Sequence, residues 1–87
     1  MTKVLKFSAD FCVPCKTLQK TINEIKPNYP DVDIQEIDIE ENDEMVNEYK
    51  IQSIPTLIFI KDDKIISRIS GSCGKDKLVE MFNELKE

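Results

Sequence analysis

The sequence contains no histidine and no tryptophan in its 87 residues, and it has only three cysteines. It also lacks any run of about 18 apolar residues, the length that a membrane-spanning helix needs, so no membrane partner is expected. The opening residues MTKVLKFSAD include no apolar stretch long enough for a signal peptide, and we therefore expect a cytoplasmic protein. In a reducing compartment, closely spaced cysteines are more often catalytic or metal-binding than structural.

Basic residues are absent between Pro27 and Tyr49, a segment that carries nine acidic residues. The net charge of -5 is therefore unevenly spread, and a surface of this sign repels nucleic acid and anionic membranes. We expect this segment to form a solvated face rather than a docking surface for a basic partner. With 40% hydrophobic residues, the chain can bury one modest core, so we expect a single domain over residues 1–87. We also expect a monomer.

The hydrophobic pattern switches repeatedly between strand and helix periods. Strands are expected at 3–8, 31–39, 56–60 and 65–70, and helices at 13–26, at 42–50 and after residue 74. The order βαβαββα predicts an α/β fold with a four-stranded mixed sheet, strand order 2-1-3-4, and helices on both faces. Ligands bind such sheets beside the carboxyl end of the first strand, where the strand order reverses, and Cys12 is expected at that position.

Cys12 and Cys15 lie three residues apart where the first strand leads into the first helix, so their sulfurs can approach closely enough to bond. Unpaired N–H groups and the helix dipole favour a thiolate at Cys12, while Cys15 should be more buried, although both are expected at an exposed helix start. We therefore expect Cys12 to attack a substrate disulfide and Cys15 to resolve the mixed disulfide. Pro14 suits the first helical turn, where a missing N–H costs nothing.

A metal is an alternative ligand for the two cysteines. A zinc site needs four ligands, and without histidine it would require Cys73 and a carboxylate as well. A Cu(I) site is a second alternative, because two thiolates are enough to bind Cu(I). We expect no metal and no cofactor, and we expect Cys73 to behave as a small apolar residue rather than a regulatory one.

A second motif, Ser53-Ile54-Pro55-Thr56, immediately precedes the most apolar strand, where proline is tolerated only at the start. The features follow one another in this order: a strand, CVPCK, a helix, Ile-Pro-Thr about 40 residues later, an apolar strand, a charged turn and another strand. This order resembles that of the thioredoxin family over essentially the whole chain. The resemblance implies a thiol–disulfide oxidoreductase that reduces protein disulfides and receives electrons from a reductase or thiol donor. It also implies a cis Pro55 against the CxxC, with Ile54 offering backbone groups to an extended substrate. The substrate-binding residues expected on this basis are Phe11, Val13, Pro14, Ile54, Pro55 and Gly71.

The chain departs from the thioredoxin pattern in four places and looks like a short member, without the additional amino-terminal strand and helix. Phe11 and Val13 stand where thioredoxins usually have tryptophan and glycine. Lys6 stands where they have a buried aspartate, and Glu36 where they often have a lysine. A desolvated Lys6 could accept the proton of Cys15 or stabilise its thiolate, with Glu36 as its partner. Alternatively, Lys6 reaches water and Glu36 belongs to the acidic face.

Two other functions fit parts of the pattern. A glutaredoxin-like reductase that uses glutathione would suit the chain length and the segment SGSCGKD, but CVPC lacks the tyrosine or phenylalanine of CPYC and CPFC motifs. A metal-carrying module also has a CxxC between its first strand and helix. Its element order would be βαββαβ, and it has no use for a proline beside the cysteines.

Overall fold

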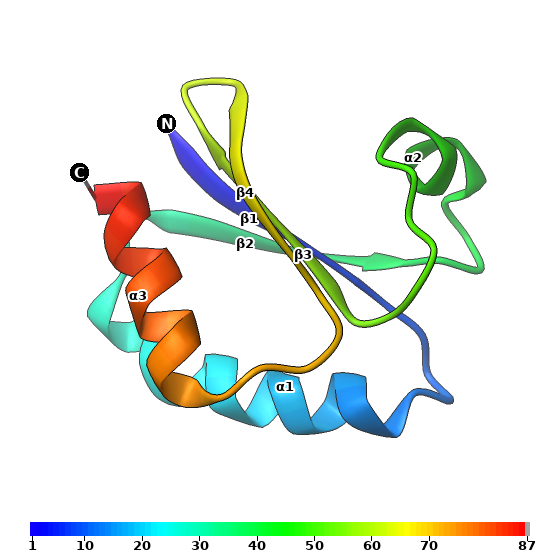
Figure 1. Ribbon diagram of the computed structural model, residues 1–87, viewed down its shortest axis with the longest axis horizontal. Coiled ribbons are helices and arrows are strands. Elements are labelled where there is room, and N and C mark those ends of the chain that lie inside the picture. The colour runs from blue at the N-terminus through cyan, green and yellow to red at the C-terminus, as the bar shows by residue number, and fades with distance from the viewer. Residues whose placement is uncertain (87) are drawn as a thin grey trace.

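Four strands form a mixed sheet in the order β2-β1-β3-β4 in the computed structural model, which describes residues 1–86 (Figure 1). The strands are β1 (Thr2–Ser8), β2 (Val32–Asp38), β3 (Thr56–Lys61) and β4 (Lys64–Ser70). The helices are α1 (Val13–Ile25), α2 (Asp43–Glu48) and α3 (Lys75–Lys86), with a short 3₁₀ helix, η1 (Lys26–Asn28), after α1. β1 runs parallel to β2 and antiparallel to β3, and β3 and β4 form an antiparallel hairpin. The predicted strand order is confirmed.

Helix α1 forms because its apolar residues recur three and four positions apart. Its buried side chains are Cys15, Leu18, Ile22 and Ile25. The helix ends one residue earlier than predicted, and the chain tightens into η1 at Pro27, which has no N–H to continue the α-helical ladder.

Helices cover both faces of the sheet, with α1 and α3 on one side and α2 on the other (Figure 1). On the first face, Val4 of β1 and Phe59 of β3 pack against α1 and α3. On the second face, Leu5 and Phe7 pack against α2, as the alternation along β1 predicts. β1 is therefore covered on both sides, and its residues from Val4 to Ser8 are all buried.

The β3–β4 hairpin turns at Asp62 and Asp63, which both have positive φ angles, of 50° and 68°. Two consecutive left-handed residues match the twist of a tight hairpin, and aspartate tolerates this conformation better than most side chains. The carboxylate of Asp62 accepts a hydrogen bond from the amino-terminal ammonium at 2.9 Å, which lowers the pKa of this carboxyl. The turn thereby ties the start of β1 to the hairpin.

The outer strands differ in charge. Within residues 1–86, β2 and β4 each pair with a neighbour on one side only. β2 exposes Asp33 and Glu36, whereas β4 exposes Lys64 and Arg68.

No helix within residues 1–86 is long and apolar enough to cross a membrane.

Candidate active site

The two cysteines of the CxxC lie just beyond the carboxyl end of β1. A turn after Ser8, in which the Cys12 N–H donates to the Ala9 carbonyl at 3.1 Å, brings Cys12 to the cap position of α1. Cys12 and Cys15 form a disulfide with their Cα atoms 5.3 Å apart. The Cys15 backbone N–H points at the Cys12 Sγ, 3.1 Å away. An N–H in this position stabilises negative charge on sulfur, which favours Cys12 as the thiolate.

The prediction that both cysteines lie at an exposed helix start is wrong for the cysteines themselves. Cys12 is 6% exposed and Cys15 2% exposed. Cys12 is buried because the cap residue turns inward and packs with Ala9, and Ile54 covers this small cluster from the β3 side. The flanking Phe11 and Val13 are 69% and 70% exposed, and Pro14 is also exposed. The sulfurs are thus recessed behind an exposed apolar rim.

The segment that precedes β3 lies against the cysteines. The Ile54–Pro55 peptide bond is cis, Pro55 is buried and Ile54 is partly buried. The Gly71 N–H donates to the Pro55 carbonyl at 2.7 Å, which joins the start of β3 to the end of β4. Gly71 has a φ of 89°, a conformation that favours glycine, while a Cβ placed there would meet no atom within 4 Å. The backbone conformation, rather than crowding within the chain, therefore accounts for glycine at this position.

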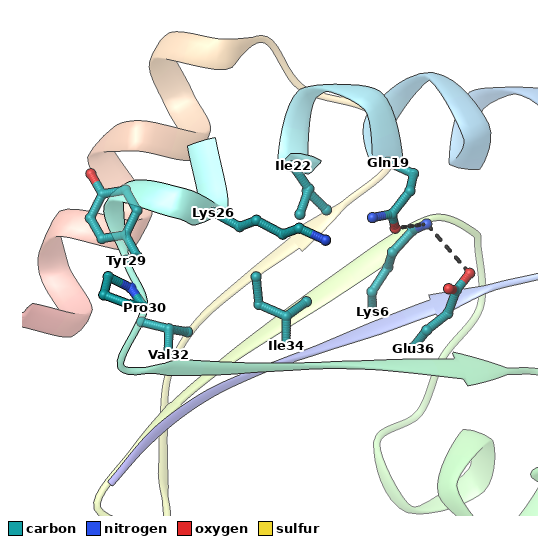
Figure 2. A pocket seen from close by; sticks show the side chains of 9 residues that line it. All are labelled: Lys6, Gln19, Ile22, Lys26, Tyr29, Pro30, Val32, Ile34 and Glu36. Carbon is teal, nitrogen blue, oxygen red and sulfur yellow. Dashed lines mark hydrogen bonds and ion pairs between the residues drawn. The ribbon is translucent and has the colours of Figure 1, made fainter. Parts of the chain in front are cut away.

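Lys6 and Glu36 face each other in the register of β1 and β2, on the side of the sheet that α1 covers. The Lys6 side chain is 2% exposed, so the alternative in which it reaches water is wrong. Its ammonium donates to Gln19 Oε1 at 2.7 Å and lies 3.6 Å from Glu36 Oε1 (Figure 2). Glu36 is 64% exposed and also accepts a hydrogen bond from the Ser8 hydroxyl at 3.1 Å. The pair is therefore buried on the lysine side only.

Gln19 is a site residue that the sequence reading missed. It lies on α1 four residues after Cys15, one helical turn further along the same face. The i, i+4 spacing from a buried cysteine was the available signal, but spacing alone does not say that the amide meets Lys6.

Cys73 lies apart from the CxxC cluster. It is partly buried and packs against the core between the sheet and helices α1 and α3, as a small apolar side chain would. Burial raises the pKa of the Cys73 thiol, and the positive charge of Lys77 opposes this effect. In residues 1–86, no three histidine, cysteine, aspartate or glutamate side chains lie close enough together to hold a metal ion.

The sheet order and a CxxC disulfide at the carboxyl end of β1 define an α/β protein of the dithiol–disulfide class. Comparison with known proteins identifies the family within this class, because the family model described as Thioredoxin matches residues 1–84. The chain belongs to the thioredoxin family.

Individual thioredoxins match almost the whole chain. Thioredoxin H5 from Oryza sativa is 37% identical over 84 residues, which make up 97% of this chain and 62% of the relative. Thioredoxin from Chlamydia trachomatis is 33% identical over 81 residues, 93% of this chain and 79% of the relative. Thioredoxin-T from Drosophila melanogaster is 33% identical, and the match spans only 52% of its length. The chain thus spans only about half to two thirds of the length of several of the thioredoxins that it matches.

The same fold occurs in solved thioredoxin structures. Thioredoxin NaTrxh from Nicotiana alata superposes with a TM-score of 0.90 at 32% identity, covering 99% of this chain and 74% of that one. The germline-specific thioredoxin Deadhead from Drosophila melanogaster gives a TM-score of 0.88 at 28% identity, covering 97% and 80%.

Proposed function

We propose that this protein reduces disulfide bonds in other proteins through Cys12 and Cys15. The observation that carries the proposal is the disulfide at the start of α1, in which the Cys15 N–H points at the Cys12 Sγ. In the reduced protein, the same N–H and the positive end of the helix would favour a thiolate at Cys12. Cys12 is therefore the nucleophile, and the more deeply buried Cys15 is the resolving cysteine.

The proposed reaction transfers two electrons and two protons to the substrate. The Cys12 thiolate attacks one sulfur of the substrate disulfide, the S–S bond breaks, and the leaving sulfur takes a proton. The Cys15 thiolate then attacks Cys12 Sγ in the mixed disulfide. The second substrate sulfur leaves with the electron pair and is protonated, and the Cys12–Cys15 disulfide forms.

The substrate would lie across the exposed rim of the cysteine cluster. Phe11, Val13 and Pro14 offer an apolar surface on one side, and Ile54, Pro55 and Gly71 form the other. Within residues 1–86, neither the amide nor the carbonyl of Ile54 takes part in a backbone hydrogen bond. An extended substrate segment could pair with these groups, which gives affinity with little sequence selectivity.

A reductase of this kind needs an external electron source. Each turnover leaves Cys12 and Cys15 oxidised, so a reductase or thiol donor must return two electrons before the next one. We place the protein in the cytoplasm, where such donors keep thiols reduced, and we propose that it acts as a monomer.

The two cysteines should respond differently to replacement in an insulin-disulfide reduction assay. Cys12→Ser should fall to the background rate, because no thiolate remains to attack. Cys15→Ser should form a covalent complex with the substrate, because the mixed disulfide is no longer resolved. The complex is detected on a non-reducing gel, with Cys73→Ala as the background that excludes capture through the third cysteine.

Reduction that persists in Cys12→Ser, or a complex that forms through Cys15 instead, would reverse the assigned roles. Running the assay with dithiothreitol, thioredoxin reductase or glutathione as the donor identifies the electron source. Turnover sustained by glutathione alone would favour a glutaredoxin-like reaction.

A further inference from the structure

Lys6 is the only charged side chain that is buried within residues 1–86. Burial of an ammonium group is costly unless close partners compensate the charge. Among the described residues, the Lys6 ammonium donates a single hydrogen bond, at 2.7 Å, and its acceptor is the neutral amide oxygen of Gln19. Its carboxylate partner, Glu36, is 3.6 Å away and is mostly exposed to water. The positive charge of Lys6 is thus only partly balanced by its neighbours.

A small cavity of about 160 Å³ connects this charge to Cys15. Lys6, Gln19 and Glu36 line the cavity together with Cys15. Since Gln19 is one turn from Cys15 on the same face of α1, the group that holds the ammonium lies next to the resolving sulfur. Two other charged residues line the cavity, Asp10 and Lys16, and both are exposed. Water screens their charges more strongly than that of Lys6.

A larger groove of about 420 Å³ lies on the other side of the same three residues. Figure 2 shows Lys6, Gln19 and Glu36 converging at one end of this groove, with Tyr29 and Pro30 at the other. The three side chains therefore separate the open groove from the small cavity beside Cys15. Because Glu36 is the exposed member, water weakens its charge more than that of Lys6.

We propose that Lys6 is a positioning residue for the second step of disulfide reduction and that its ammonium stabilises the Cys15 thiolate. The inference rests on the proposed function, in which Cys15 attacks Cys12 Sγ. Lys6 takes no part in the proton transfer, and the proton of Cys15 leaves to solvent before the new S–S bond forms. Gln19 holds the ammonium beside the cavity, and Glu36 reduces its effect.

The test is the ionisation of Cys15 in the Cys12→Ser/Cys73→Ala background, where it is the only thiol. Thiolate absorbance at 240 nm is recorded against pH. Lys6→Met should move the midpoint to higher pH, because the anion loses its neighbouring cation, by about one unit or tenfold in thiolate fraction. Lys6→Arg should leave the midpoint where it is with Lys6 present, since arginine keeps the positive charge but does not act as a base.

Glu36→Gln should move the Cys15 midpoint in the opposite direction from Lys6→Met. Removing the carboxylate should move the midpoint to lower pH, because the Lys6 charge is then unopposed. Asp33→Asn is the matched control: it removes one negative charge from the same strand, at an exposed position in the alternate register, and should leave the midpoint unchanged. Both positions are exposed, so these variants remain informative even if Lys6→Met does not fold.

Three outcomes would overturn the proposal: an unmoved midpoint in folded Lys6→Met, a Glu36→Gln shift in the same direction as Lys6→Met, or an equal shift in Asp33→Asn. The titration uses no disulfide substrate, so it does not depend on reductase activity. If the Cys15 midpoint shifts as described but the unmodified protein fails to reduce insulin, the effect of Lys6 on Cys15 is supported and the proposed function is refuted.

Discussion

Cys12 and Cys73 show how position determines the chemistry of one residue type. Cys12 caps α1, and its sulfur accepts the Cys15 N–H, so its surroundings favour negative charge. Cys73 packs against an apolar core, and burial raises the pKa of its thiol. Cys12 should therefore be the more reactive of the two sulfurs, although it is also the more buried.

Alkylation of the reduced protein measures this difference. With limiting iodoacetamide at pH 7, Cys12 should be modified at least about tenfold faster than Cys73, because the thiolate is the reactive form. The rate at Cys73 should keep rising as the pH is increased from 7, because burial raises the pKa of its thiol and little thiolate is present at neutral pH. Peptide mass spectrometry locates the adducts, and Cys73→Ala should lose only the slow one. Equal labelling of both residues at pH 7 would contradict this assignment.

Helix α2 illustrates how a short element is held by its neighbours. It spans only Asp43–Glu48, and its cap residue Asn42 makes no side-chain hydrogen bond to the helix start. The guanidinium of Arg68, on β4, donates to the Tyr49 carbonyl at 2.6 Å and to the Lys50 carbonyl at 2.9 Å. These carbonyls lie at the carboxyl end of α2, where a cation is favourable.

Arg68→Ala should loosen α2 without disturbing the cysteines. We expect a loss of about 1 kcal/mol in the free energy of unfolding, because two charge-assisted hydrogen bonds at an exposed site are removed. Hydrogen exchange should rise over Asp43–Glu48 and stay unchanged in α1. Lys64→Ala removes a cation from the same strand and serves as the control. Uniform exchange changes across the sheet would mean that Arg68 supports the hairpin rather than α2.

At the scale of the whole molecule, the uneven charge opposes folding. The net charge is -5, and nine acidic residues lie between Pro27 and Tyr49, the part of the chain that forms β2 and α2. Few ion pairs offset this repulsion, and the Lys75–Glu24 pair, at 3.3 Å, is largely exposed on both sides. Compaction of the chain therefore brings like charges together.

Added salt should stabilise the protein against urea. Raising NaCl from 0.1 to 1 M shortens the screening length from ~10 to ~3 Å, and we expect the free energy of unfolding to increase by roughly 0.5–1 kcal/mol. Unfolding is followed by circular dichroism. Glu40→Lys with Glu48→Lys, both at exposed positions, should raise stability at low salt and reduce the salt response. A fall in stability with salt would show that ion pairs outweigh the repulsion.

The sequence pattern predicted the element order and the strand order, because these follow from periodicity and crossover geometry. The pattern did not predict how deeply the side chains of Lys6 and Glu36 are buried. Lys6 lies on a central strand and Glu36 on an outer one, so one face of the sheet buries the first and exposes the second. The contact between Gln19 and Lys6, and the inward turn of Cys12, depend on packing between elements and were not predictable from spacing.

The charges on the outer strands also bear on how copies of the chain could assemble. An exposed strand edge invites pairing with another molecule, and two β2 edges in contact would oppose Asp33 and Glu36 with carboxylates of the same kind. Pairing of β2 with the basic β4 of another copy would be head-to-tail, a contact that forms either a closed ring or an open filament. In β4, however, the register shift opposite Phe59 and Ile60 interrupts the flat edge. The acidic outer strand thus opposes pairing of two β2 edges at neutral pH, and this opposition weakens near the isoelectric point of about 4.7.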